Sequence, residues 1–431
     1  LTKNKLHAIC NKLNIKGRFL YLLSTCDDIA WLCNIRGGDI PYNPLVISYV
    51  AFTEEQIYLF TGEGAIDNML KCELSDNGIT VLPYYDYEKF IYNFDKSFTR
   101  VAPPDRISVK MFNAAVAKGA SYLPDTIRGG VVGSLKAIKN GTEIEGFRDA
   151  MIRDGVAWVR FWRYMEDEIN SDDNIITEES LAAKIAHFRS EDENYLGESF
   201  SPIVAFGGNA AMPHYSPFGN GAVNVKKEGF LLVDTGGQYI NGTTDTTRTF
   251  VLGDLTKEQI RDYTLVLKGM INLSLAKFIK GTRGASLDIL ARGAVFSAGK
   301  LYTHGTGHGI GHNLCVHEGP QSIRMEENPV ALEPGMVISN EPAIYEEDSY
   351  GIRIENTILC SKWTENKYGE FYQFETLTFV PIDTKGVDSA ILGEEAREWL
   401  NNYHSHVFRK LSPYLNEDER LWLAGKTLQI N

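Results

Sequence analysis

Residues 229–251 read GFLLVDTGGQYINGTTDTTRTFV, and this stretch combines two strand-like patterns with two aspartates. Asp234 ends the first apolar strand, and Asp245 lies in the second strand, after the pair Gly236-Gly237. A hairpin through those glycines would bring both carboxylates close together on one face. Two carboxylates that close repel each other and do not both stay ionised unless a cation lies between them. The alternative is that Asp245 only pairs with Arg248.

A second informative stretch is rich in histidine and glycine, and it reads HGTGHGIGH over residues 304–312. It does not match the dinucleotide motif G-x-G-x-x-G, because Ile310 occupies the last required position. Glycines beside histidines instead allow close backbone approach and aim imidazoles at one point. His304, His308 and the nearby His317 are therefore candidate functional residues, whereas we expect His312 to be structural.

Two glutamates follow apolar strand patterns further along the chain. Glu341 comes after Met336–Asn340, and Glu355 ends the run that begins at Gly351. Their spacing leaves room for a turn and a return strand. Strand alternation places Arg353 on the same face as Glu355, where it could steady the carboxylates. An ordinary ion pair at a strand edge is the alternative.

Together these residues supply two aspartates, two glutamates and one histidine. Such an oxygen-rich set favours hard divalent ions such as manganese. Four carboxylates balance two dications, and ions about 3.5–4 Å apart can share a water and lower its pKa. The chain has no H-E-x-x-H motif, which disfavours a single-zinc protease. It also has no G-x-S-x-G and no recognisable cysteine nucleophile motif, which disfavours a serine hydrolase of that type and a cysteine protease.

Composition narrows the partners and the setting. The chain has 431 residues and a net charge of −13, which argues against a nucleic acid or an anionic membrane as partner. No apolar run approaches the roughly 18 residues of a membrane span. Scattered cysteines indicate reduced thiols of a cytoplasmic protein. Residues 1–14 lack a secretory pattern, but the chain begins at Leu1, so a missing upstream part and a vacuolar or lysosome-like location are left open.

Residues 1–130 have the pattern of one α/β domain that ends in a glycine cluster at 128–133, which we interpret as a hinge or a domain boundary. The pattern predicts a helix followed by strands, at 1–13 and then at 18–23, 45–52, 57–60, 79–82 and 107–110.

Residues 131–431 have a different pattern, in which a long and a short helix occur twice. In the first pair, the long helix begins with a capping box at Thr142–Glu145 and extends to Ile169, and the short helix spans 178–188. In the second pair, the long helix begins with a cap at Thr256 and ends at Gly281, and the short helix spans 286–298. We infer two duplicated helix–helix–sheet halves that face each other, with chance similarity as the alternative. Residues of about 385–431 are helical and aromatic, in the core or in a subunit contact.

The candidate residues resemble the metallopeptidase family of the pita-bread fold, which includes methionine aminopeptidase, prolidase and aminopeptidase P. The family order Asp, Asp, His, Glu, Glu is matched by Asp234, Asp245, His308, Glu341 and Glu355. The nearer resemblance is to the eukaryotic cytosolic Xaa-Pro aminopeptidases. The segments that carry it are 28–44, 213–217, 304–311, 339–342 and 351–356.

This resemblance implies an α/β (α+β) architecture, with a creatinase-like domain over 1–130 and a pita-bread catalytic domain over 131–431. It implies hydrolysis of the bond between an N-terminal residue and a penultimate proline, by a hydroxide that bridges two divalent metal ions. The resemblance implies that these ions are manganese. It also implies a homodimer formed through the C-terminal region. Long family members carry two N-terminal domains, and one is visible here. Ala343 replaces a glycine of the relatives but leaves every ligand intact.

The resemblance also assigns roles residue by residue. One metal would be held by Asp234 with the bridging Asp245 and Glu355, and the other by His308 and Glu341 with the same bridges. Glu341 would accept a proton. His317 would stabilise the oxyanion, and His214 and His304 would line the proline side and shuttle protons. His308 and Arg353 complete the implied substrate contacts. The competing interpretations are a prolidase, which cleaves only dipeptides, and a non-catalytic peptide-binding module.

Overall fold

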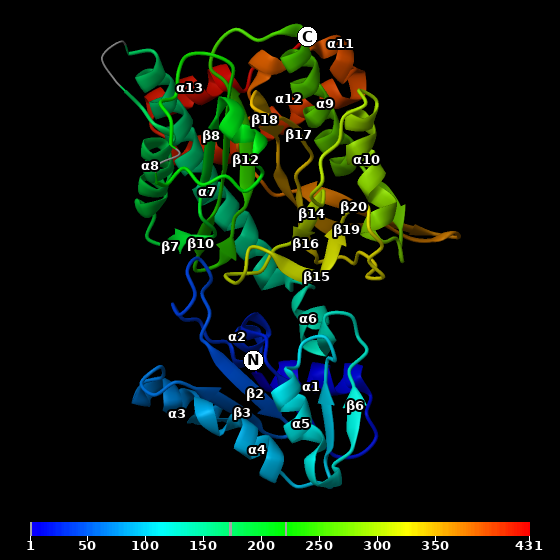
Figure 1. Ribbon diagram of the computed structural model, residues 1–431. Coiled ribbons are helices and arrows are strands. Elements are labelled where there is room, and N and C mark those ends of the chain that lie inside the picture. The colour runs from blue at the N-terminus through cyan, green and yellow to red at the C-terminus, as the bar shows by residue number, and fades with distance from the viewer. Residues whose placement is uncertain (1, 172–174, 220–221) are drawn as a thin grey trace. The chain divides into compact units, whose positions relative to one another are not determined.

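The computed structural model describes residues 2–171, 175–219 and 222–431 (Figure 1). The chain divides after Ala137 into two compact units. The first unit contains α1 (Thr2–Leu13), β1 (Phe19–Leu23), α2 (Cys26–Cys33), β2 (Ser48–Phe52), β3 (Ile57–Thr61), α3 (Asn68–Asp76), β4 (Ile79–Pro83), α4 (Tyr87–Asn93), β5 (Thr99–Ala102), α5 (Val109–Val116), β6 (Tyr122–Pro124) and α6 (Gly130–Lys136). Its described strands form one sheet in the order β4-β3-β2-β1-β5-β6.

This sheet is buried on both faces, which explains the continuous apolar run of its central strand. All five residues of β1 are buried. Two separate apolar clusters pack on the sheet: one includes Ile9 of α1 and Ile29 of α2, and the other includes Ile91 of α4 and Ala115 of α5. Helices on both faces are typical of an α/β unit.

The first unit differs from the expectation in two places. Residues 107–110 are not a strand, because the Ser108 hydroxyl accepts a hydrogen bond from the Met111 amide (3.3 Å) and so caps α5. Strands β5 and β6 were not predicted, because their patterns are short and mixed. The glycine cluster at 128–133 includes the start of α6 at Gly130, and the chain divides into its two units shortly after it.

The second unit begins with α7 (Gly141–Ile169) and α8 (Glu178–Ser190). These are followed by β7 (Tyr195–Glu198), β8 (Ile203–Phe206), the 3₁₀-helix η3 (Gly207–Ala211), β9 (Phe230–Thr235), β10 (Gly237–Tyr239), β11 (Gly242–Thr243), β12 (Thr246–Val251), α9 (Lys257–Ser274), β13 (Lys277–Ile279), α10 (Gly284–Phe296), β14 (Gly307–Gly309), β15 (Glu318–Ile323), β16 (Val337–Asn340), β17 (Ala343–Glu346), β18 (Tyr350–Arg353), β19 (Asn356–Asn366), β20 (Gly369–Thr376), α11 (Ser389–Leu392), α12 (Glu394–Leu411) and α13 (Glu417–Lys426).

The helix pairs of this unit occur as predicted, with different ends. Helix α7 is capped by Asn140 in a reciprocal capping box with Glu143, two residues before the predicted Thr142 cap. The Thr256 cap of α9 is confirmed, but α9 ends at Ser274 rather than near Gly281. The chain leaves the helix there because Lys277–Ile279 pairs with β20 as strand β13.

The two helix pairs belong to two halves of the unit. In Figure 1, α7 and α8 lie on one side, α9 and α10 lie on the other, and β8, β12, β17 and β18 lie between them. The first half contributes the sheet β12-β9-β8, and the second contributes the sheet β13-β20-β19-β16-β14-β15. The C-terminal helices enter the core through Leu400, Val407 and Leu423. Among the described residues, no helix is long and apolar enough to cross a membrane.

Candidate metal centre

The two aspartates are brought together by an antiparallel strand pair. In the register of β9 with β12, Asp234 lies opposite Thr247, and Asp245 directly precedes β12. The connection is not the tight hairpin expected at Gly236-Gly237, because β10 and β11 lie between the strands and form a separate sheet in which β10 pairs with both β11 and β7. Gly236 is required for another reason: a Cβ there would lie 1.8 Å from the Thr244 carbonyl oxygen.

The two glutamates face each other across a second antiparallel pair. The register runs from Asn340 opposite Asn356 to Ala343 opposite Arg353, so Glu341 lies opposite Glu355. The Glu355 amide donates to the Thr247 carbonyl (3.1 Å). This hydrogen bond joins the second pair to β12, so the two halves of the unit deliver their carboxylates to one place.

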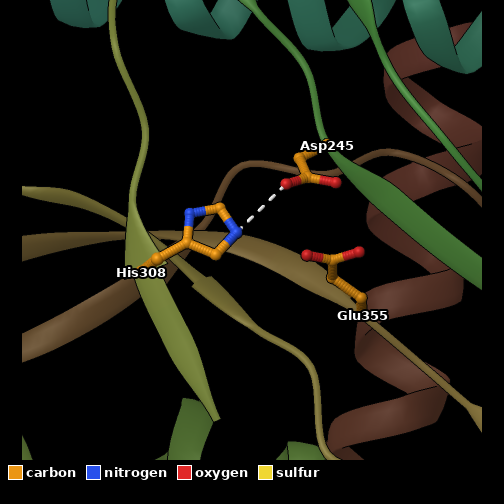
Figure 2. A group of neighbouring side chains, drawn as sticks. All are labelled: Asp245, His308 and Glu355. Atoms are coloured by element: carbon orange, nitrogen blue, oxygen red, sulfur yellow. Dashed lines mark ion pairs between the residues drawn. The ribbon is translucent and has the colours of Figure 1, made fainter. Parts of the chain in front are cut away.

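His308 completes this set from strand β14. Its Nδ1 lies 2.9 Å from the Gly309 carbonyl oxygen, which leaves Nε2 facing Asp245 Oδ2 (3.4 Å) and Glu341 Oε1 (3.5 Å). Figure 2 shows the side chains of His308 on β14, Asp245 just before β12 and Glu355 just before β19 pointing toward one another. One ligand atom from each of these three lies within 4.8 Å of the other two.

Arg353 holds the remaining aspartate. Its Nη2 donates to Asp234 Oδ2 and its Nη1 donates to the Tyr345 hydroxyl, each at a distance of 2.5 Å. The pair is buried rather than an ordinary strand-edge ion pair, since Arg353 is 2% exposed. Among the described residues, Arg248 donates to groups such as the Val380 carbonyl oxygen (2.8 Å) rather than to Asp245.

Sequence reasoning missed two residues that support the centre. The Tyr345 hydroxyl lies 2.9 Å from His304 Nε2, and the Thr247 hydroxyl donates to Glu355 Oε2 (2.7 Å). Strand alternation from Glu341 would have placed Tyr345 on the same face. Thr247 gives no comparable signal, because it is one of several threonines in the same strand.

Burial and mutual repulsion perturb the acidic groups. Desolvation, reinforced by the neighbouring carboxylates, raises the pKa of Asp245, raises that of Glu341 to about 7, and raises that of Glu355 well above its ordinary value. Burial opposes the charge of His308, but its contact with Asp245 and the charge of Glu341 raise its pKa to about 9. The protein therefore holds more negative charge here than it compensates.

The donor set fits divalent cations. It contains four carboxylates and an imidazole, and Asp234 Oδ1 is buried with no hydrogen-bond partner among the described residues. An orphaned buried carboxylate oxygen is costly unless a cation binds it. Oxygen donors with one imidazole match hard divalent ions.

These groups line a cavity of about 240 Å³. All nine residues singled out from the sequence line it: His214, Asp234, Asp245, His304, His308, His317, Glu341, Arg353 and Glu355. Phe200, Ile203 and Pro213 add an apolar wall. Burial lowers the pKa of both His304 and His317 to about 4, so both imidazoles are neutral at physiological pH. As expected, His312 has a structural place, with its ring 5.6 Å from that of Phe147.

Two facing halves that deliver carboxylates and an imidazole to one cavity define the class, a metallohydrolase of the pita-bread fold. Comparison with family models agrees. Residues 145–362 match metallopeptidase family M24, residues 1–143 match the creatinase/prolidase N-terminal domain, and residues 370–430 match the C-terminal region of the same peptidase family. The chain belongs to metallopeptidase family M24.

Its relatives within that family include proteins named as Xaa-Pro aminopeptidases. The probable Xaa-Pro aminopeptidases P of Botryotinia fuckeliana and Tuber melanosporum are each 38% identical, over 97% and 99% of this chain. The X-prolyl aminopeptidase of Caenorhabditis elegans, described as a cytosolic enzyme with a di-nuclear active site, is 36% identical with a TM-score of 0.93 over the whole chain. The Xaa-Pro dipeptidase of Bacillus anthracis (21% identity, TM-score 0.69, 89% of this chain and 99% of that one) shares the fold. The chain spans 65%, 71% and 71% of the first three relatives.

Proposed function

We propose that this protein removes the N-terminal residue from peptides whose second residue is proline. The observation that carries the proposal is the single cavity lined by the four carboxylates, the imidazoles and an apolar wall. Proline has no N–H and a fixed φ, so an enzyme cannot grip it through that donor. Phe200, Ile203 and Pro213 offer apolar surface that could hold the ring by shape instead.

We assign the metal ligands as follows. Asp234, Asp245 and Glu355 would hold one divalent ion, and His308 and Glu341, with Asp245 and Glu355 shared, would hold the other. Bound ions would supply Lewis acidity at the scissile carbonyl and lower the pKa of a water. Manganese suits this oxygen-rich set and is the metal we propose. Arg353 fixes Asp234 and compensates part of the charge.

The chain's own residues would handle the protons. Glu341 is the proposed proton acceptor, because its pKa is raised to about 7, and a general base works best when its pKa lies near the working pH. His304 Nδ1 lies 2.7 Å from the Gly305 carbonyl oxygen and 3.9 Å from Glu341 Oε2, and its Nε2 lies 2.9 Å from the Tyr345 hydroxyl. This position beside Glu341 supports the proposed role of His304 in shuttling a proton on the proline side. Neutral His317 would donate a hydrogen bond to the developing oxyanion. The exposed His214 would contact the substrate at the open side of the cavity.

A chelation and rescue assay tests this function. The chelated protein should be inactive on an Xaa-Pro-Xaa tripeptide, and manganese should restore hydrolysis of the first bond only. Glu341→Gln should lose turnover while keeping the fold, as judged by circular dichroism. Hydrolysis of Xaa-Pro dipeptides without any tripeptide cleavage would favour a prolidase. A chain that holds less than one transition metal and shows no turnover would favour a peptide-binding module.

We also propose a homodimer in the cytoplasm. The cytosolic C. elegans relative supports the location, and the aromatic C-terminal helices are the candidate contact. Light scattering distinguishes a dimer from the 48.3 kDa chain. A monomer at micromolar concentration would contradict the dimer without affecting the catalytic proposal.

A further inference from the structure

Glu178, the first residue of α8, is a fully buried carboxylate in the second unit that lies outside the metal centre. Its side chain is 0% exposed. Its Oε1 accepts from the Phe206 amide (2.7 Å), and its Oε2 accepts from the Tyr215 hydroxyl (2.6 Å) and the Val223 amide (3.0 Å). The Asn209 side-chain amide donates to both oxygens, at 3.0 and 3.1 Å. These donors are neutral, and together they offset the cost of burying the charge at a helix N-terminus.

Three of these four donor residues lie in the connection between β8 and β9, which the structure describes at 207–219 and 222–229. The fourth, Phe206, is the last residue of β8. The Glu178 amide also donates to the Val223 carbonyl oxygen (3.2 Å). Glu178 therefore binds this connection near its start, at its middle and beyond residue 221. A single acceptor holds positions that are far apart along the connection.

The connection forms a wall of the metal cavity. Pro213 and His214 line that cavity, while Phe206, Asn209 and Val223 line a neighbouring cavity of about 930 Å³. His214 is exposed, so its own packing does little to fix its position. Its place at the metal cavity depends on the backbone on either side, where Asn209 and Tyr215 are bound to Glu178.

Helix α8 gives this anchor a fixed reference. At the other end of the helix, the buried Arg189 donates to Asp154 Oδ1 (2.6 Å) and to the Thr235 hydroxyl (2.7 Å). Thr235 directly follows the proposed ligand Asp234 on β9. One helix thus contacts both the metal-binding strand and the connection that carries His214.

We infer that Glu178 is a positioning residue that fixes His214 at the substrate cavity. The inference rests on the proposed function for the role of His214 in turnover. Glu178 does not touch the cavity and has no catalytic role of its own. Its effect passes through Asn209, Tyr215 and the backbone amides that it binds.

The first test is amide hydrogen exchange on the full chain, which needs no activity. Glu178→Gln points an amide NH₂ at some of the present donors, so the amides of Phe206 and Val223 should exchange at least about tenfold faster. Tyr215→Phe removes one donor from the opposite side and should produce a smaller change in the same peptides. Tyr263→Phe is the matched control. Tyr263 lies on α9, outside this connection, and the substitution removes the buried hydrogen bond that its hydroxyl donates to the Asp383 carbonyl oxygen (2.6 Å).

The second test is a double-mutant cycle with His214→Ala. Glu178→Gln should lower kcat/KM on an Xaa-Pro-Xaa tripeptide by about 10- to 100-fold, the scale of a misplaced contact group. In the His214→Ala background the same change should cost less than about twofold. Manganese affinity, measured by calorimetry, should stay within about twofold of the parent protein, because the ligands are untouched.

The outcomes separate the two proposals. Additive effects of Glu178→Gln and His214→Ala, or unchanged exchange between β8 and β9, overturn the positioning role. If Glu178→Gln does not fold, Tyr215→Phe carries the same cycle with the same criteria. If the parent protein has no turnover with manganese, the aminopeptidase proposal fails, and hydrogen exchange alone decides whether Glu178 fixes the connection that carries His214.

Discussion

Glu341→Gln should stabilise the metal-free protein at pH 8 while removing its activity. The Glu341 side chain is 18% exposed, and desolvation together with repulsion from Asp245 raises its pKa to about 7 from an ordinary value of 4.5. The unfolded chain ionises this group near pH 4.5, whereas the folded chain holds its proton until about pH 7. Stability of the metal-free protein therefore falls as pH rises through this interval.

The size of the effect follows from the pKa difference. At about 1.4 kcal/mol for each pKa unit, the shift corresponds to about 3 kcal/mol. Relative to the parent, the glutamine variant should gain about 2–3 kcal/mol between pH 5 and pH 8, because it has no group to ionise. For a unit of this size, that gain is roughly 5 °C in Tm.

Thermal unfolding in excess chelator measures this difference. Tryptophan fluorescence is a suitable signal, since Trp31 is in the first unit and the other five tryptophans are in the second. Comparing the two proteins at each pH cancels the contribution of titrating groups that do not interact with Glu341. With manganese the order should reverse, because the variant lacks a ligand and gains less from binding.

Glu318→Gln is the matched control. Glu318 is buried more deeply than Glu341 and pairs with Lys139, so its loss leaves a buried ammonium without its counter-charge. This variant should lose about 3 kcal/mol at both pH values. If Glu341→Gln is less stable than the parent at pH 5 and pH 8 in chelator, the carboxylates do not repel each other as argued here.

Three further predictions follow from individual contacts. Arg353→Met should weaken manganese binding by about 10- to 100-fold, because Asp234 and Tyr345 lose their shared donor; calorimetry measures this, and unchanged affinity would contradict the supporting role. Since His304 and His317 have pKa values lowered to about 4, and bound cations lower them further, His317→Asn should leave the pH dependence of kcat/KM between pH 6 and 7 unchanged; loss of an inflection near 6.5 would show that the imidazole titrates there. Gly307→Ala should destabilise the protein by at least about 2 kcal/mol, because the new Cβ would lie 2.0 Å from the Ser339 carbonyl oxygen, whereas Gly293→Ala, with open space on α10, should stabilise it by up to about 1 kcal/mol in urea unfolding.

The sequence by itself determined much of this protein. Apolar runs that end in charged residues at Asp234 and Glu355 predicted a buried metal centre. The order of the five proposed metal-binding residues along the chain matched one family. Amphipathic periodicity predicted α7 and α9, because the residues that form one face of a helix lie close together in the sequence. The short strands β5 and β6 were not predicted, because three or four residues carry too little periodic signal.

Only the tertiary structure decided which groups meet. The strand register sets Glu341 opposite Glu355, and the amide of Glu355 reaches the carbonyl of Thr247, which lies 108 positions earlier in the chain. Glu178 has no distinguishing pattern at the start of a helix, yet it binds the connection that carries His214. Such long-range partners depend on how packed elements approach one another, and local preference does not encode that approach.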